Sequence, residues 1–210
     1  ALLAGTYYRW SLDDEGAKAY TTSGTIVDLQ GEVLAEVQLP KDTTLMGLDW
    51  SPVEDNLVGG LTGERGAWLW RWDAQGNSVG AIVEIPNTDQ ALLGAVNPIW
   101  SPDGSRIAFG LRQWHLWEEN TSRTELAVYR LEEKEPRVVG PADWGCDADS
   151  ASWSPDGATV YYELADHVEG DETWTKANGR VWMVSTEAEE PTPTPWPGDE
   201  ERYLPAVDPS

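Results

Sequence analysis

The pentapeptide Trp-Ser-Pro-Asp-Gly occurs twice in this 210-residue chain, at residues 100–104 and again at residues 153–157. Ser-Pro-Asp-Gly has the composition of a tight turn, because proline presets φ, aspartate suits the next position and glycine tolerates positive φ. The residues after the first copy, SRIAFGL at 105–111, alternate in polarity as a strand does. Each copy therefore predicts a β-hairpin, and the tryptophan before the turn is large enough to wedge between neighbouring sheets.

The pentapeptide belongs to a longer internal repeat. Residues 99–110 read IWSPDGSRIAFG and residues 152–163 read SWSPDGATVYYE. Looser copies precede them, DWSPVEDNLVGG at 49–60 and RWSLDDEGAKAYTT at 9–22. The repeat anchors are Trp10, Trp50, Trp100 and Trp153. LPAVDPS at 204–210 reads like the start of a fifth copy, with Val207 at the tryptophan position.

Each copy is followed by the pattern of short strands. The first copy predicts strands at 6–11, 17–22, 25–29 and 33–39, and the second at 46–51, 56–61, 67–72 and 80–85. The third predicts strands at 97–101, 106–111, 125–131 and 136–140, and the fourth at 151–154, 159–164 and 180–185, with a weak strand after 190. Repeats of about 40 to 54 residues with four short strands predict propeller blades.

We therefore expect an all-β fold, a β-propeller of four-stranded antiparallel blades, as a single domain over residues 1–210. The four visible blades span about residues 6–40, 46–86, 96–140 and 150–190. Residues 203–210 are the start of a further blade or a closing strand. Both ends of the chain read as cut, so we expect a piece of a larger propeller.

The string W-S-P-D-G-x-x-I-A-F resembles the repeat of TolB-type, WD-like β-propellers, which are found in bacterial periplasmic proteins and in the propeller domains of peptidases. The resemblance is clear at Trp100 and Trp153, looser at Trp50 and weak at Trp10, where Leu12 stands in place of the proline. The family motif is structural, so the resemblance implies a propeller and carries no catalytic residue. Such propellers usually have six or more blades.

The composition restricts the possible partners. A net charge of −23 would repel nucleic acid and anionic membrane surfaces. No run of 18 apolar residues is present, so we expect no transmembrane segment. Cys146 is the sole cysteine and cannot form an internal disulfide. The Thr/Pro-rich stretch EEPTPTPWPGDEE at 189–201 favours an extracytoplasmic location, and we expect it to be a strap or loop between blades.

One face of the predicted propeller collects long insertions. They lie at residues 86–96, 112–124, 141–150, 165–179 and 187–202. Connections of this length usually indicate function, and these are rich in tryptophan and acids. The candidate partner-binding residues are Trp114, His115, Trp117, Trp144, His167 and Trp174. The alternative is that these tryptophans fold back and seal their own loops.

Other chemistry has weaker support, and we assign no catalytic residue, no cofactor and no metal ligand. Paired carboxylates are weak evidence of a glycosidase in so acidic a chain. The stretch at 146–150 has alternating acids at Asp147 and Asp149 but lacks a complete calcium loop. His115 and His167 could share a metal, although two histidines are more often surface groups. The stretch AWLWRW at 67–72 is a sugar-stacking platform or, as we favour, packing against the next blade.

The sequence therefore predicts a protein without enzymatic activity. We expect a propeller scaffold that presents its acidic, Trp-rich loop face to a protein partner, as a possible subunit of a larger extracytoplasmic assembly. Two alternatives stay open: the substrate-filtering propeller of a prolyl-oligopeptidase-like peptidase, and a glycan-binding lectin. A catalytic domain in the parent gene would decide for the first, and exposed Trp68, Trp70 and Trp72 would favour the second.

Overall fold

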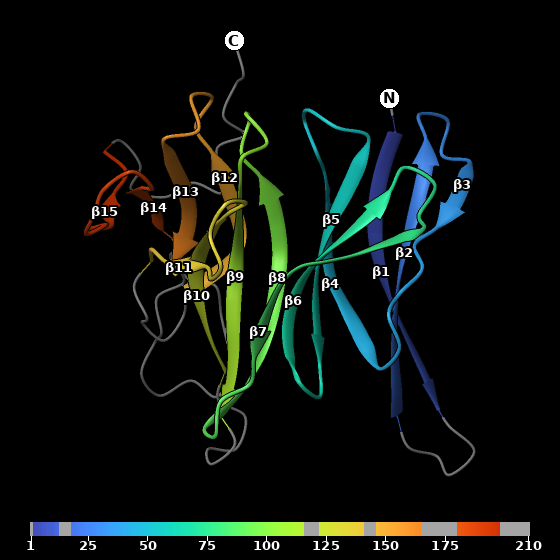
Figure 1. Ribbon diagram of the computed structural model, residues 1–210. Helices are drawn as coiled ribbons and strands as arrows, with labels where there is room; N and C mark the ends of the chain where they lie inside the picture. Colours follow the sequence, from blue (N-terminus) through green and yellow to red (C-terminus); the bar gives the residue numbers. More distant parts are fainter. Residues whose placement is uncertain (1, 13–17, 116–121, 141–145, 165–179, 198–210) are drawn as a thin grey trace.

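The computed structural model describes residues 2–12, 18–115, 122–140, 146–164 and 180–197. This part of the chain forms fifteen β-strands and no helix (Figure 1). The strands form a fan of antiparallel sheets, which confirms the predicted all-β propeller fold. The described chain forms only part of a propeller.

The first sheet has the order β1–β2–β3, with β1 at Leu2–Leu12, β2 at Lys18–Asp28 and β3 at Val33–Glu36. Three strands stand here where four were predicted, because β2 runs without a break through the two strands predicted at 17–22 and 25–29. The prediction left residues 23 and 24 between two strands, but Gly24 lies inside β2. A Cβ on Gly24 would lie 2.7 Å from Leu48 and 2.9 Å from Leu45, so the glycine serves close packing.

The second and third sheets follow the predicted four-strand pattern. The second contains β4 (Thr43–Trp50), β5 (Asn56–Gly63), β6 (Gly66–Asp73) and β7 (Ser78–Pro86). The third contains β8 (Ala91–Trp100), β9 (Arg106–His115), β10 (Ser122–Arg130) and β11 (Arg137–Val138). A single bridge, Thr62 to Gly94, joins them into one eight-stranded sheet.

The fourth sheet has the order β12–β13–β14–β15. Its strands are β12 at Cys146–Trp153, β13 at Thr159–Leu164, β14 at Arg180–Ser185 and β15 at Thr194–Pro195. The weak fourth strand predicted after residue 190 is therefore confirmed. It is short because proline cannot donate to a strand ladder.

Three hydrophobic layers hold the sheets face to face. Ile26, Leu45 and Trp72 are among the residues between the first and second sheets. Val58, Trp100 and Phe109 belong to the layer between the second and third. Leu126, Trp153 and Tyr162 belong to the layer between the third and fourth. The tryptophan before each pentapeptide turn is thus a wedge between sheets: Trp100 is 7% exposed and Trp153 is 8% exposed.

The strands that end in an anchor tryptophan share a backbone irregularity. β4, β8 and β12 each carry a register shift a few residues before the tryptophan, at 45/48, 96/99 and 147/152. β1 pairs with β2 without any shift, and it runs in the opposite direction to β8 (Figure 1). Trp10 lies on β1, so the weakest repeat match does not occupy the place in its sheet that Trp100 occupies.

Candidate functional site

The pentapeptide turn at residues 101–105 is closed by its own side chains. The hydroxyl of Ser101 donates to Asp103 Oδ1 at 2.6 Å and accepts from the backbone N–H of Arg106 at 2.9 Å. Asp103 also accepts from the N–H and the hydroxyl of Ser105. Gly104 adopts a φ of 70°, a left-handed value that glycine accepts without strain.

The second copy repeats this geometry. The hydroxyl of Ser154 donates to Asp156 Oδ1 at 2.6 Å and accepts from the N–H of Thr159 at 2.9 Å. Gly157 has a φ of 71°. Hydrogen bonds to Asp156 from Ser154 and Ala158 lower its pKa, and bonds from Ser101 and Ser105 lower the pKa of Asp103 to about 2. Carboxylates of such low basicity make poor general bases at neutral pH, so these Ser–Asp pairs are structural.

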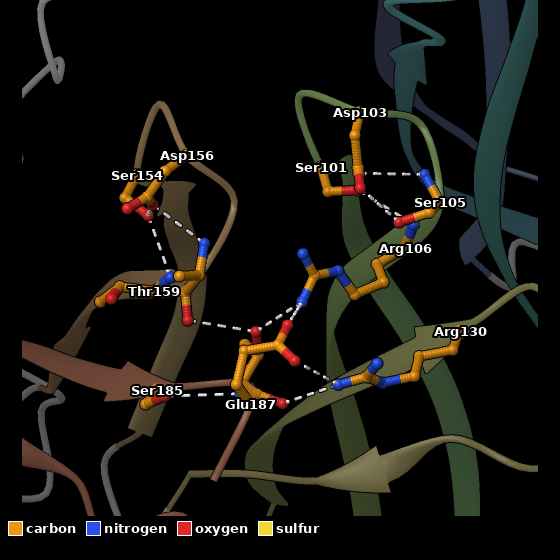
Figure 2. A network of polar contacts seen from close by, with 12 residues as sticks. Ser101, Asp103, Ser105, Arg106, Arg130, Ser154, Asp156, Thr159, Ser185 and Glu187 are labelled. Carbon is orange, nitrogen blue, oxygen red and sulfur yellow. Dashed lines mark hydrogen bonds and ion pairs between the residues drawn. The ribbon is translucent and has the colours of Figure 1, made fainter.

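Next to these turns, a buried arginine crosses from the third sheet to the fourth (Figure 2). Arg106, the first residue of β9, has a side chain that is 9% exposed. Its guanidinium carbon lies 5.3 Å from the centre of the Trp153 ring. Its Nη1 donates to Thr186 Oγ1 at 3.0 Å and forms an ion pair with Glu187. A cation stacked on an indole and paired with a carboxylate is a stable combination.

A second arginine, on the neighbouring strand β10, completes this cluster. Arg130 donates to the Thr186 carbonyl at 3.1 Å and to Glu187 Oε2 at 3.4 Å. Partial desolvation raises the pKa of Glu187, but Arg106 and Arg130 outweigh it and lower the pKa. We call Arg106, Arg130, Thr186 and Glu187 the arginine joint. Sequence reasoning missed the arginine joint. The available signal was Arg106, a basic residue directly after the turn at 101–105, in a repeat whose next anchor tryptophan is Trp153.

At the opposite end of the third sheet, a second polar group lies where the long insertion was predicted. Gln113 Nε2 donates to Glu125 Oε2 at 2.8 Å, and Arg123 forms an ion pair with Glu125. Glu125 is 9% exposed. The Trp114 ring lies over Gly94 on β8, where a Cβ would come within 2.8 Å of it. This packing fits the alternative that Trp114 covers its own sheet.

The structure places only part of the predicted partner-binding set. Trp114 is half-buried and pairs with Ser122 across β9 and β10, and His115 is the last residue of β9. Trp117, Trp144, His167 and Trp174 lie outside the described residues. The insertion predicted at 112–124 is shorter, because β9 and β10 pair through most of it. Likewise only residues 87–90 separate β7 from β8.

Two of the three tryptophans of β6 are buried and the third is partly buried. Trp72 is fully buried and donates from Nε1 to the Gln38 carbonyl at 2.8 Å. Trp68 is 5% exposed, and Trp70 is partly buried with Nε1 bonded to Ser78. Packing was therefore the right interpretation, but the partner is the preceding sheet and not the next one. This burial removes the support for a lectin.

The described residues contain neither a metal-binding cluster nor a membrane-spanning helix. In these residues no three His, Cys, Asp or Glu side chains gather in an arrangement that could hold a metal ion. Asp147 is placed only by its backbone in β12. Over the same ranges there is no helical segment with the length and apolar character that a membrane crossing requires.

Comparison with known proteins shows partial similarity to peptidases. No family model matches the chain. It is 31% identical over 86 residues to dipeptidyl-peptidase 5 of Trichophyton equinum, covering 40% of this chain and 12% of that protein. It is 35% identical over 80 residues to dipeptidyl-peptidase 5 of Aspergillus fumigatus, covering 37% of this chain and 10% of that protein. The chain therefore matches only about a tenth of these relatives' length.

Solved structures support the fold. The hydrazine synthase of Kuenenia stuttgartiensis superposes with a TM-score of 0.53 at 15% identity, over 92% of this chain and 55% of that chain. The tricorn protease gives a TM-score of 0.52 at 11% identity, over 79% of this chain and 16% of that chain. A chain of the nidogen/laminin complex gives 0.52 at 10% identity, over 90% and 61%. At such identities the likeness shows the β-propeller fold alone.

These findings correct the functional prediction. A protein without enzymatic activity was expected, but the curated relatives are named as peptidases, which overturns that expectation. They support a propeller associated with a peptidase, which was the alternative interpretation. The relatives are fungal, so the bacterial origin suggested by the TolB-type resemblance is not confirmed, and no TolB-specific family is shown.

Proposed function

We propose that this chain is the propeller part of a dipeptidyl-peptidase, and that it restricts which peptides reach a catalytic domain outside these 210 residues. The observation that carries the proposal is the similarity to dipeptidyl-peptidase 5, 30% to 35% identical over 80 to 86 residues. In this proposal the propeller selects substrates and the catalytic groups lie elsewhere in the enzyme.

The described structure suits a selecting role. Three continuous apolar layers hold the sheets rigidly, and the turns between strands are closed by local bonds. Within the described ranges, neither Ser–Asp pair is hydrogen-bonded to a histidine or lysine that could act as a general base. The net charge of −23 would attract peptides with a free, positively charged amino terminus. Rigid walls and a negative field together favour short unfolded peptides over folded proteins.

Several finer expectations belong to the same proposal. A TolB-type repeat, an extracytoplasmic location and a protein partner on the loop face are all compatible with a peptidase propeller. The residues proposed for that face remain those of the long insertions, with Trp114 the one whose side chain is described. We expect the single domain and its blade limits as predicted, with residues 203–210 in a further blade or a closing strand.

The proposal is tested on the full-length parent protein. We expect it to release dipeptides from chromogenic dipeptidyl substrates and to be inactivated by a serine-directed reagent. A parent protein that carries no hydrolase domain and cleaves no dipeptidyl substrate would refute the proposal.

The selecting role has its own test. Deleting residues 1–210 from an active parent should speed the cleavage of a long or folded substrate relative to a dipeptidyl substrate. If both rates change in parallel, the propeller does not select.

A separate pull-down with Trp114→Ala examines the partner face, and unchanged capture would exclude this residue from it.

A further inference from the structure

The arginine joint exists at one interface between sheets and not at its neighbour. Asn56 stands at the start of β5 as Arg106 stands at the start of β9. Its side chain, however, bonds within its own turn, from Nδ2 to Glu54 Oε2 at 2.5 Å. Between the second and third sheets, the corresponding turn contact is apolar, with Val53 packed against Gly104. The joint is therefore an added feature of the third and fourth sheets.

The joint fixes the segment that follows β14. Thr186 donates its N–H to the Ala158 carbonyl at 3.0 Å, which ties it to the fourth sheet. Arg106 and Arg130 tie Thr186 and Glu187 to the third sheet, and Arg137 donates to the Glu189 carbonyl. The segment then runs through prolines to β15. We call residues 186–197 the strap.

Beyond Glu189, the strap is held by few contacts. The N–H of Trp196 donates to the Val181 carbonyl at 2.9 Å, and β15 pairs with β14 at two positions. The Trp196 ring meets Tyr161 edge-on, with centroids 6.4 Å apart. Because apolar packing along the strap is slight, its attachment to the third sheet depends on charge. Side-chain exposure is 9% for Arg106 and 53% for Glu187, so water and protons reach the acidic partner.

We propose that Arg106, Arg130 and Glu187 form an acid-sensitive latch that fixes the strap across the third and fourth sheets and loosens it when Glu187 is protonated. Arg106 stays charged throughout, so protonation leaves a buried cation with Thr186 and the Trp153 ring as its remaining partners. That state is unfavourable, and it favours release of the segment that supplies Glu187. The proposal does not depend on the peptidase function.

The direction of the pH dependence follows from the groups that face Glu187. They are Arg106 on β9 and Arg130 on β10, and Arg130 also lies 3.8 Å from Glu133. On the strap itself, Glu189 and Glu190 add negative charge. The two arginines place the pKa of Glu187 below its ordinary 4.5. The latch is therefore closed at neutral pH and opens as the pH falls through this lowered value.

Hydrogen exchange of the 210-residue chain, followed by mass spectrometry on peptides from the strap, tests this latch. We expect Glu187→Gln to exchange its strap amides at least about tenfold faster than wild type at pH 7, the size for a charge-assisted pair. Lowering the pH to about 2, with rates corrected for intrinsic exchange, brings the wild type below the lowered pKa of Glu187 and should abolish the difference between the two proteins. Arg130→Gln should show a smaller increase, because it removes the longer of the two ion pairs.

The matched control is Glu190→Gln, which removes the same charge three residues away, at an exposed site for which the structure describes no ion pair. Its strap should exchange like wild type at both pH values. Peptides from β9 report whether each variant is folded and should be unchanged in all of them. Equal strap exchange in wild type and Glu187→Gln at pH 7 would overturn the latch. So would a difference between them that persists undiminished at about pH 2.

Discussion

Replacing Trp153 with alanine is the most direct test of how the sheets are held together. The indole is 8% exposed and lies in the layer between the third and fourth sheets. Truncating a buried tryptophan to alanine costs about 3–5 kcal/mol. Here the change also leaves the Ile99 carbonyl without the indole donor at 3.2 Å and removes the ring under Arg106. We therefore expect a loss of about 4 kcal/mol in the free energy of unfolding.

Urea unfolding followed by far-UV circular dichroism measures this loss. With an m-value of about 2 kcal/mol/M, the midpoint should fall by about 2 M while the slope is unchanged. Trp153→Phe keeps an aromatic ring beneath Arg106 but loses the hydrogen bond, and should cost about 1–2 kcal/mol. Trp196→Ala, a half-buried control with one edge contact, should cost less than about 1 kcal/mol. If the Trp153→Ala midpoint lies within about 0.5 M of the wild-type midpoint and the m-value is unchanged, Trp153 does not hold the two sheets together.

Two further substitutions probe the backbone and the turns. Gly60→Ala should destabilise the protein by about 3 kcal/mol in thermal unfolding, because its Cβ would lie 2.2 Å from the Ala95 carbonyl oxygen. Gly31→Ala, with open space around it and a left-handed φ of 85°, should cost about 1–2 kcal/mol of backbone strain, and equal losses would contradict the close approach. Asp103→Asn should lower the melting temperature at neutral pH, since the pKa of Asp103 is about 2 against 3.8 ordinarily. That difference should hold down to about pH 4 and vanish near pH 2, and a difference independent of pH would exclude the carboxylate as its cause.

Much of the fold was predictable because short sequence patterns that repeat along the chain determine the turns and strands. A Ser-Pro-Asp-Gly turn is closed by bonds among its own four residues and the two that follow, so its sequence predicts its geometry wherever it occurs. The strands that follow it alternate in polarity, and their bounds were predicted closely in the second sheet, whereas β8 and β9 of the third sheet are several residues longer than predicted. Burial of Trp100 and Trp153 followed from their size and their place before the turn.

The rest depended on contacts that a single sequence does not reveal. Gly24 was left outside the predicted strands, but it lies within β2, where neighbouring leucines leave no space for a side chain. The supposed insertion after Leu111 is largely strand, because Trp114 packs onto Gly94 of the adjacent β8. Arg106 and Glu187 are 81 positions apart in the chain, and only the fold brings them together. The link to peptidases came from relatives, since the repeat itself carries no chemistry.

Because the pentapeptide turn makes its hydrogen bonds locally, it also affects how a chain of this kind can lengthen by duplication. Exchanging one copy for the other should leave either hairpin intact, since no bond of the Ser–Asp pair leaves the copy and the two residues that follow it. The side chain that differs between the units and reaches the adjacent sheet is the one two positions after the glycine, which is arginine in the first copy and threonine in the second. Duplication can therefore add hairpins without disturbing the turn. A single substitution at that position then changes which residues of the adjacent sheet the hairpin contacts.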